Sequence, residues 1–136
     1  MKKIFLAFLA VAAFGCSSDN NDDVNEDAFT GDLRLIGTWQ VERRWLYGDE
    51  YPLTECGGED KFVFNKNGNY ILNEFWNNIG VGCVDEGSAG TFSLFSSALT
   101  LDFQGGSRVV TIVNLTDTKL KVNFGDSDIK QYKKID

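Results

Sequence analysis

An alternating stretch between Leu35 and Tyr47 constrains this chain most strongly. It reads Leu-Ile-Gly-Thr-Trp-Gln-Val-Glu-Arg-Arg-Trp-Leu-Tyr. On one parity it places Trp39, Val41, Trp45 and Tyr47, and on the other it places Gln40, Glu42 and Arg44. A period of two with one polar face is typical of a strand half buried against a core. The stretch therefore predicts a β-strand whose apolar face turns inward.

Seven more short segments with strand character follow, separated by turns rich in Gly, Asn and Asp. They cover residues 61–65, 70–76, 89–95, 98–103, 108–115, 119–124 and 128–135. Between the third and fourth strands, Asn77 to Ser88 reads as a long Gly-rich loop, and residues 32–37 read as a short turn. An antiparallel meander removes its two edges most simply by closing on itself. The sequence therefore predicts an all-β, eight-stranded, antiparallel up-and-down barrel, which can be filled by side chains or hold one small ligand.

The turn Asn65-Lys66-Asn67-Gly68 admits two hairpin registers. A two-residue turn would place Phe64 opposite Ile71, whereas a type I turn with a bulge at Gly68 would place Phe64 opposite Tyr70. The second register gathers the apolar side chains on one face, namely Phe62, Phe64, Tyr70, Leu72 and Trp76. Because a one-residue slip exchanges the two faces, we predict the bulged turn.

The first sixteen residues have the pattern of an export signal. A basic start, Met1-Lys2-Lys3, precedes an apolar run from Ile4 to Phe14, and Gly15-Cys16 follows. The run is too short to span a bilayer as a helix, which favours a secretory signal peptide. The Gly-Cys junction resembles the lipobox of bacterial lipoproteins, in which the cysteine becomes the lipidated first residue. We therefore predict a lipoprotein signal at 1–15 and fatty acylation of Cys16, the alternative being a soluble secreted protein cleaved nearby.

Residues 16–32 are predicted to form an acidic, disordered tether. Between Ser17 and Thr30 there are five acids, no base and little to bury. The acidic run after the cysteine resembles the export signal that sends some Gram-negative lipoproteins to the outer face of the outer membrane. The alternative is a solvated spacer that carries no sorting signal. The sequence thus predicts outer-membrane lipid as a partner, with a barrel at 33–136 on the cell surface.

Composition argues against several classes of function. The net charge of −7 and the pI of about 4.5 disfavour nucleic acid as a partner. The chain has no His, which removes Ser-His-Asp and Cys-His catalysis and every His-based metal site. It also has no Gly-rich phosphate loop and no nucleophile elbow. We therefore predict no enzymatic activity, no cofactor and no metal, the alternative being an enzyme that uses the carboxylates at the rim of the barrel.

Cys56 and Cys83 are the two cysteines that remain after Cys16. Outside the cytoplasm we expect them to form a disulfide between two loops at one end of the barrel, with free thiols or a redox pair as the alternative. Several acids surround them in the sequence: Asp49, Glu50, Glu55, Glu59, Asp60, Asp85 and Glu86. Such carboxylates could hold Ca²⁺, but no EF-hand spacing is present, so a solvated acidic rim is favoured.

Arg43 and Glu74 each fall on the apolar parity of a predicted strand. Burying an unpaired charge is costly, so each should pair, reach the open end of the barrel or contact a ligand. We hypothesise that they supply the polar end of a ligand pocket lined by Trp45, Tyr47, Phe62, Phe64, Tyr70, Leu72 and Trp76. The alternatives are a mutual ion pair, exposure at the rim, or a strand register displaced by one residue.

Several segments of the chain resemble a known protein family. Gly37-Thr38-Trp39 matches the Gly-x-Trp signature of lipocalins, and 62–70 and 99–101 resemble short lipocalin-like domains of bacterial surface lipoproteins. The resemblance covers about residues 33–136. It implies that Gly37 and Trp39 close one end of the barrel, and that a basic residue of the last strand, Lys130 or Lys133, covers the indole.

The resemblance also implies a binding fold. The predicted function is a membrane-anchored surface protein that takes a small, mainly apolar ligand. The alternative is a barrel filled by its own aromatic side chains, whose outer surface or loops contact a protein or glycan. The sequence gives no indication of the oligomeric state.

Overall fold

The computed structural model describes residues 29–136, which form strands and two short 3₁₀ helices. The strands are β1 (Gly37–Leu46), β2 (Asp49–Tyr51), β3 (Lys61–Phe64), β4 (Asn69–Asn73), β5 (Phe75–Asn78), β6 (Gly82–Asp85), β7 (Ser88–Phe95), β8 (Ala98–Phe103), β9 (Gly106–Leu115), β10 (Lys119–Asn123) and β11 (Asp128–Lys134). The 3₁₀ helix η3 (Leu33–Leu35) lies at the predicted turn before β1, and η4 (Gly57–Glu59) precedes β3. Within this part of the chain, no helix has the length and apolar character needed to cross a bilayer.

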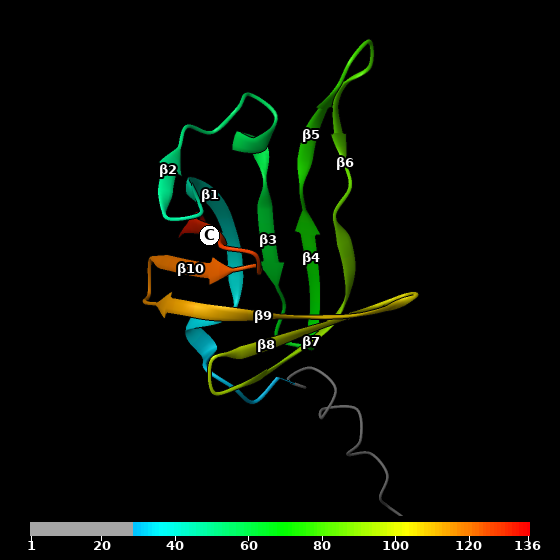
Figure 1. Cartoon of the computed structure of the whole chain (residues 1–136). Helices are drawn as coiled ribbons and strands as arrows, with labels where there is room; N and C mark the ends of the chain where they lie inside the picture. The colour runs from blue at the N-terminus through cyan, green and yellow to red at the C-terminus, as the bar shows by residue number, and fades with distance from the viewer. Residues whose placement is uncertain (1–28) are drawn as a thin grey trace, which may run out of the picture.

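Eight strands form a closed antiparallel barrel, which confirms the predicted fold. Their order is β1-β3-β4-β7-β8-β9-β10-β11, and β11 pairs with β1 to close the ring. β2 pairs with the end of β1, and β5 and β6 form a separate two-stranded sheet that rises beyond the barrel (Figure 1). The eight strands close into a ring and enclose a buried cluster of their own, which is the property expected of a domain that folds by itself.

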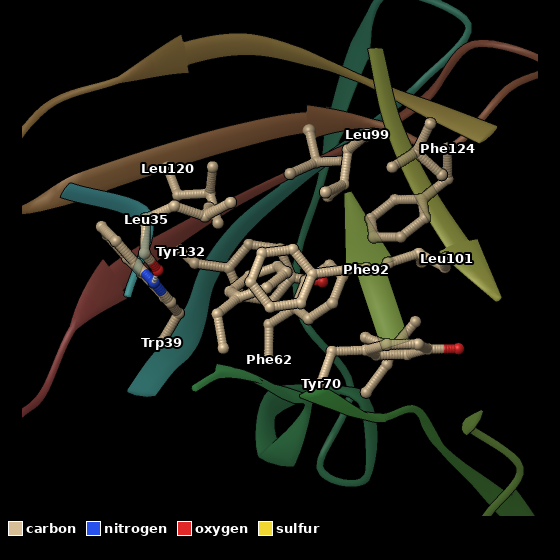
Figure 2. Packing of buried hydrophobic residues seen from close by; sticks show 14 of the residues in the cluster. Leu35, Trp39, Phe62, Tyr70, Phe92, Leu99, Leu101, Leu120, Phe124 and Tyr132 are labelled. Carbon is tan, nitrogen blue, oxygen red and sulfur yellow. Dashed lines mark hydrogen bonds between the residues drawn. The ribbon is translucent and has the colours of Figure 1, made fainter. Parts of the chain in front are cut away.

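One end of the barrel, here called the closed end, is filled by side chains. The rings of Phe62 and Phe64 stack with centroids 4.3 Å apart, and Tyr132 packs edge-on against Phe62 at 5.8 Å. Figure 2 shows the rings of Phe62, Phe92 and Tyr132 among leucine side chains from several strands of the barrel. The buried cluster comprises Phe29, Leu35, Trp39, Val41, Phe62, Phe64, Tyr70, Leu72, Phe92, Leu99, Leu101, Val110, Leu120, Val122, Phe124 and Tyr132. A packed core of apolar side chains therefore occupies the interior.

Trp39 lies at the base of this core and is fully buried. Its indole N–H donates a 2.9 Å hydrogen bond to the Leu35 carbonyl of η3, and the Lys134 ammonium lies 5.0 Å from its ring centroid. The predicted covering residue was Lys130 or Lys133; it is Lys134, because the register sets Lys134 directly opposite Trp39. Gly37 has a φ of 138°, and a Cβ there would lie 3.0 Å from Lys134 Cε, so this position favours glycine.

The β3–β4 hairpin has the bulged turn predicted from the segregation of its faces. Phe64 pairs with Tyr70, and the Gly68 N–H donates to the Asn65 carbonyl at 3.0 Å. Gly68 has a φ of 92°, the left-handed conformation that a bulge at this position requires.

A β-bulge in β1 corrects the predicted alternation of that strand. In the pairing with β11, Val41 is opposite Tyr132 and Arg43 is opposite Gln131, so Glu42 is an extra residue. An extra residue reverses the inside and outside positions of everything that follows it. Arg43 and Trp45 therefore lie on the outer surface, where Arg43 and Lys121 flank the Trp45 ring at 4.8 and 4.3 Å.

Residues 77–88, predicted as a long loop, include most of a second hairpin. β5 and β6 pair from Phe75 opposite Asp85 to Asn78 opposite Gly82, and they carry the strand directions of β4 and β7 past the barrel rim. The segment alternates for too few residues to give a strand signal, which is why its sequence reads as a loop. Its tip exposes Ile79 and Val81, which are 93% and 71% accessible.

The packed part of the chain begins before residue 33. Phe29 falls in the segment predicted as a tether, yet its ring is buried and lies 4.8 Å from that of Phe92. Its N–H donates to the Lys66 carbonyl in the β3–β4 turn at 2.9 Å. Residues 29–32 therefore belong to the folded unit and join it at the closed end, whereas Cys16 and the signal segment lie outside the described residues.

The two indoles of β1 give a matched test of inside against outside. We expect Trp39→Ala to lower the free energy of unfolding by about 3–5 kcal/mol, because it empties a fully buried site. Trp45→Ala should lower it by less, about 1–2 kcal/mol, because that ring lies on the outer face and is only partly buried. Urea denaturation of residues 29–136 followed by circular dichroism measures both, and equal losses would contradict the assigned faces.

Candidate functional site

The opposite end of the barrel, here called the mouth, contains a cavity of about 940 Å³. Its walls come from the end of β1, β2, the loop that leads to η4, and both strands of the β5–β6 hairpin. Figure 1 shows these elements together beyond one end of the barrel. Apolar wall residues are Leu46, Tyr51, Pro52, Leu53, Phe75 and Trp76; polar and charged ones are Arg44, Thr54, Glu55, Asp60, Glu74, Asn77, Glu86 and Lys130. This volume suits one small organic molecule.

Asp60 and Lys130 lie at the floor of this mouth cavity and are only 3% and 6% exposed. The Lys130 ammonium donates to Asp60 Oδ2 at 2.9 Å and to Glu74 Oε2 at 3.3 Å. Arg108 lies 3.7 Å from Glu74 Oε1 and also stacks over the Phe124 ring at 5.0 Å. These four charged residues form an ion network at the boundary between the packed core and the cavity.

Asp60 also fixes the backbone around the mouth. Its second carboxylate oxygen accepts a 2.7 Å hydrogen bond from the Phe75 N–H at the start of β5. Its carbonyl accepts from the Val41 N–H at 3.1 Å and from the Gln40 side-chain amide at 3.2 Å. One buried carboxylic acid residue therefore ties β1, β5 and β11 together at the floor of the cavity.

Tyr132 lies beneath this network, two residues along β11 from Lys130. Its ring is fully buried, and its hydroxyl has no hydrogen-bond partner within the described residues. Burial raises the pKa of the Tyr132 phenol well above its ordinary value, and the nearby carboxylates of Asp60 and Glu74 raise this pKa further.

The Cys56–Cys83 disulfide forms as predicted and joins two walls of the cavity. Cys56 precedes η4 and Cys83 lies on β6, so the bond ties the mouth loop to the projecting hairpin. The two cysteines are 27 residues apart in sequence, and closing a loop of this length contributes about 3–4 kcal/mol in the chain-entropy description.

The structure distributes the nine predicted ligand-binding residues over three environments. Glu74 and Trp76 line the mouth cavity. Phe62, Phe64, Tyr70 and Leu72 point inward as predicted, but they are fully buried in the core below the cavity and line none of it. The bulge in β1 moves Arg43 and Trp45 to the outer surface, and Tyr47 is 77% exposed at the β1–β2 turn. Arg43 pairs with Glu50 rather than with Glu74, at 2.6 Å.

Sequence reasoning missed several cavity residues. Arg44 and Leu46 line it because the bulge turns them inward, and Arg44 is held by Asp128 at 3.1 Å. Lys130 had one available signal, since it shares its parity with Tyr132 on the last strand. Its partner Asp60 is 70 residues away in sequence, and no local pattern links the two. In the described part of the chain, no group of three acidic, Cys or His side chains is arranged to hold a metal ion.

Comparisons with known proteins agree with this fold. Residues 35–122 match a family described as "Lipocalin-like domain", so the chain belongs to that family. A crystal structure of a lipocalin-like protein from Bacteroides uniformis superposes with a TM-score of 0.56 at 13% identity, covering 75% of this chain and 99% of that one. An uncharacterized protein from Bacteroides eggerthii gives 0.54 at 15% identity, covering 74% and 99%. The search of curated proteins gives no significant match.

Removing the central cation of the ion network should be strongly destabilising. Lys130→Met leaves Asp60 buried without its cation, so we expect a loss of about 3–5 kcal/mol in the free energy of unfolding. The double variant D60N/K130M should recover a large part of that loss, because no buried charge remains. The control Lys121→Met removes a surface cation and should lower stability by about 1 kcal/mol or less. Urea denaturation distinguishes these outcomes, and equal effects of the two single variants would contradict a buried network.

The unpartnered phenol predicts a stabilising substitution. Tyr132→Phe should raise the free energy of unfolding by about 1 kcal/mol near neutral pH, because it removes a buried hydroxyl that makes no hydrogen bond. Tyr70→Phe should instead lower it by about 1 kcal/mol, because the Tyr70 hydroxyl is 2.8 Å from Ser88 Oγ.

The same substitution should change the response to alkali. A phenol whose pKa is raised by folding loses its contribution to stability only as the pH rises beyond the unfolded value of about 10. The advantage of Tyr132→Phe over wild type should therefore grow above about pH 10, as measured by urea denaturation at a series of pH values. A constant difference would show that Tyr132 titrates normally.

Proposed function

We propose that this protein is a lipid-anchored binding protein of the cell surface, attached to the outer membrane through acylated Cys16, and that its mouth cavity takes a small, mainly apolar ligand. The cavity is the observation that carries the binding proposal. It is open at one end, about 940 Å³ in volume, and bounded below by a packed core. A concave site with apolar walls and a few convergent polar groups is the usual form of a small-molecule site.

The ligand would lie above the barrel core rather than within it. Leu46, Leu53, Phe75 and Trp76 supply apolar wall surface, whereas the ion network supplies the polar floor. Nothing in this arrangement resembles a catalytic constellation, so we propose a binding domain rather than an enzyme. The anchor is supported by the basic start, the apolar run and the Gly15-Cys16 junction of the sequence.

A second candidate function is an interaction module that contacts a protein or glycan. It is favoured by the filled interior and by the exposed Ile79 and Val81 at the tip of the β5–β6 hairpin. The disulfide would hold that hairpin in place for such a contact.

Native mass spectrometry of the protein extracted from its own cell envelope tests both parts of the proposal. We expect a chain that begins at Cys16 and carries covalent acyl chains, together with a retained small molecule that dissociates at higher collision energy. Cys16→Ser should lack the acyl mass and leave the outer-membrane fraction. Protease treatment of intact cells should degrade the wild-type protein if the barrel lies on the surface.

Two results would contradict the proposal in different ways. An unacylated chain in the soluble fraction would remove the anchor without affecting the binding site. A protein that never carries a small molecule, and that shows no binding to an added library of apolar compounds, would favour the interaction module instead.

A further inference from the structure

Three large apolar side chains are exposed at the closed end of the barrel. Phe95 ends β7 and is 84% exposed, and Leu33 begins η3 and is 63% exposed. Ile135 is 47% exposed, and its N–H donates to the Thr38 carbonyl near the start of β1 at 2.9 Å. None of the three belongs to the buried cluster, so the packing of the core does not explain them. Several such side chains at one end of a molecule are typical of a surface that contacts an apolar partner.

The elements that carry Phe95 and Leu33 are fixed to the base of the core. β7 leads from the mouth past Phe92, whose ring packs against Phe29, and reaches the β7–β8 turn after Phe95. Leu33 begins η3, the helix whose last carbonyl accepts the indole N–H of Trp39. Figure 1 shows the β7–β8 turn, η3 and the entry of the chain at the end opposite the β5–β6 hairpin.

The two ends of the barrel also differ in charge. On the mouth side, residues 49–60 contain five acids and no base, and Asp85 and Glu86 add two more acids at the end of β6. The closed end carries both signs, namely Arg34, Lys66, Lys133, Lys134, Asp32, Asp117 and Asp136. A surface of anionic lipid headgroups therefore repels the mouth more strongly than the closed end.

The proposed anchor would bring the closed end next to a membrane. The chain joins the fold there at Phe29, and twelve residues separate Phe29 from Cys16. A chain of this length spans at most about 45 Å. A bilayer that holds Cys16 is therefore always within reach of the closed end, and this high local concentration makes a contact through a few side chains effective.

We propose that the closed end of the barrel rests on a lipid bilayer, with Phe95, Leu33 and Ile135 in the interfacial layer, so that the mouth cavity opens away from the membrane. This inference rests on the proposed anchor and adds how the barrel is oriented on it. The apolar side chains stabilise the contact by leaving water. A second copy of the chain fits this end less well, because two barrels joined there would enclose both chain entries between them.

Fluorescent labels at the two ends test the orientation. The chain from residue 17 carries an N-terminal histidine tag in place of acylated Cys16, which attaches it to phosphatidylcholine vesicles containing phosphatidylglycerol and a nickel-chelating lipid. Because Cys56 and Cys83 are paired, Ser97→Cys or Ile79→Cys gives one reactive thiol for a nitrobenzoxadiazole label. We expect the label at 97 to shift its emission to shorter wavelength and to be quenched by lipid-borne nitroxides. The label at 79, on the hairpin tip, should emit as it does in water.

Matched serine substitutions in the protein labelled at 97 locate the contact. Phe95→Ser should lower the ratio of membrane-contacting to free label about tenfold, because one large apolar side chain no longer leaves water. Leu33→Ser should lower the ratio in the same direction. Ile79→Ser removes a side chain that is 93% exposed at the opposite end, and it should leave the ratio unchanged. Each spectrum is compared with that of the same variant without vesicles.

Four results would overturn this inference. Equal shifts at 79 and 97, a shift at 79 alone, or no shift at either position would show that the closed end does not face the membrane. An unchanged ratio in Phe95→Ser would show that the apolar side chains do not hold the contact. A shift at 97 that grows with protein concentration in the absence of vesicles would assign this surface to a second copy of the chain.

Failure of the closed-end contact is distinguishable from failure of the proposed anchor. The nickel-chelating lipid supplies the attachment, so the measured orientation does not depend on acylation of Cys16. An unacylated chain in the cell envelope would remove the anchor and leave these measurements unchanged. Loss of the closed-end contact would leave both the anchor and the mouth cavity in place.

Discussion

The pairing of β1 with β11 holds the rest of this structure in place. Eight strands in a row leave two open edges, and each edge carries backbone groups that need partners. The β1–β11 pairing satisfies both edges at once and turns a sheet with two open edges into a closed barrel around an apolar interior. The same pairing contains the bulge at Glu42, so it also decides which residues of β1 face the cavity and which face water.

The barrel then divides into two halves with different chemistry. Below the ion network, aromatic and aliphatic side chains fill the space, and Trp39 seals it by bonding to the Leu35 carbonyl. Above it, the end of β1, the mouth loop and the β5–β6 hairpin form the walls of the cavity, and the disulfide joins the loop to the hairpin. A network that is both buried and charged is costly to assemble, and apolar residues of similar volume would often be as stable. Its presence at the boundary is therefore better explained by the cavity above it than by the core below.

The sequence was sufficient for the features that depend on local patterns. The hairpin register of Phe64 and Tyr70 followed from the separation of polar and apolar faces, and the barrel followed from eight strands with turns between them. The bulge in β1 could not be predicted from the sequence. One extra residue in an alternating strand leaves the alternation intact on each side, so the sequence contains no local signal of the bulge. That single residue is why Arg43 and Trp45 were assigned to the wrong side.

The sequence also could not show how far along the barrel axis an inward-facing residue lies. Parity shows that Phe62 and Leu72 point inward, but it does not show whether they pack against one another or border a hollow. Lys130 and Asp60 were similarly hidden, because their contact joins the last strand to a loop 70 residues earlier. A strand pattern gives little information about contacts between residues that come together only because the barrel closes.

The position of Phe29 determines where the chain enters the barrel. Its ring packs against Phe92, and its N–H is hydrogen-bonded to the β3–β4 turn. The chain therefore enters the barrel at the closed end, away from the mouth. A force transmitted through the preceding segment would therefore act on the closed end of the barrel, where Phe29 and Trp39 are buried. The rim of the mouth lies at the other end, where the disulfide, Asp60 and Asp85 hold its backbone.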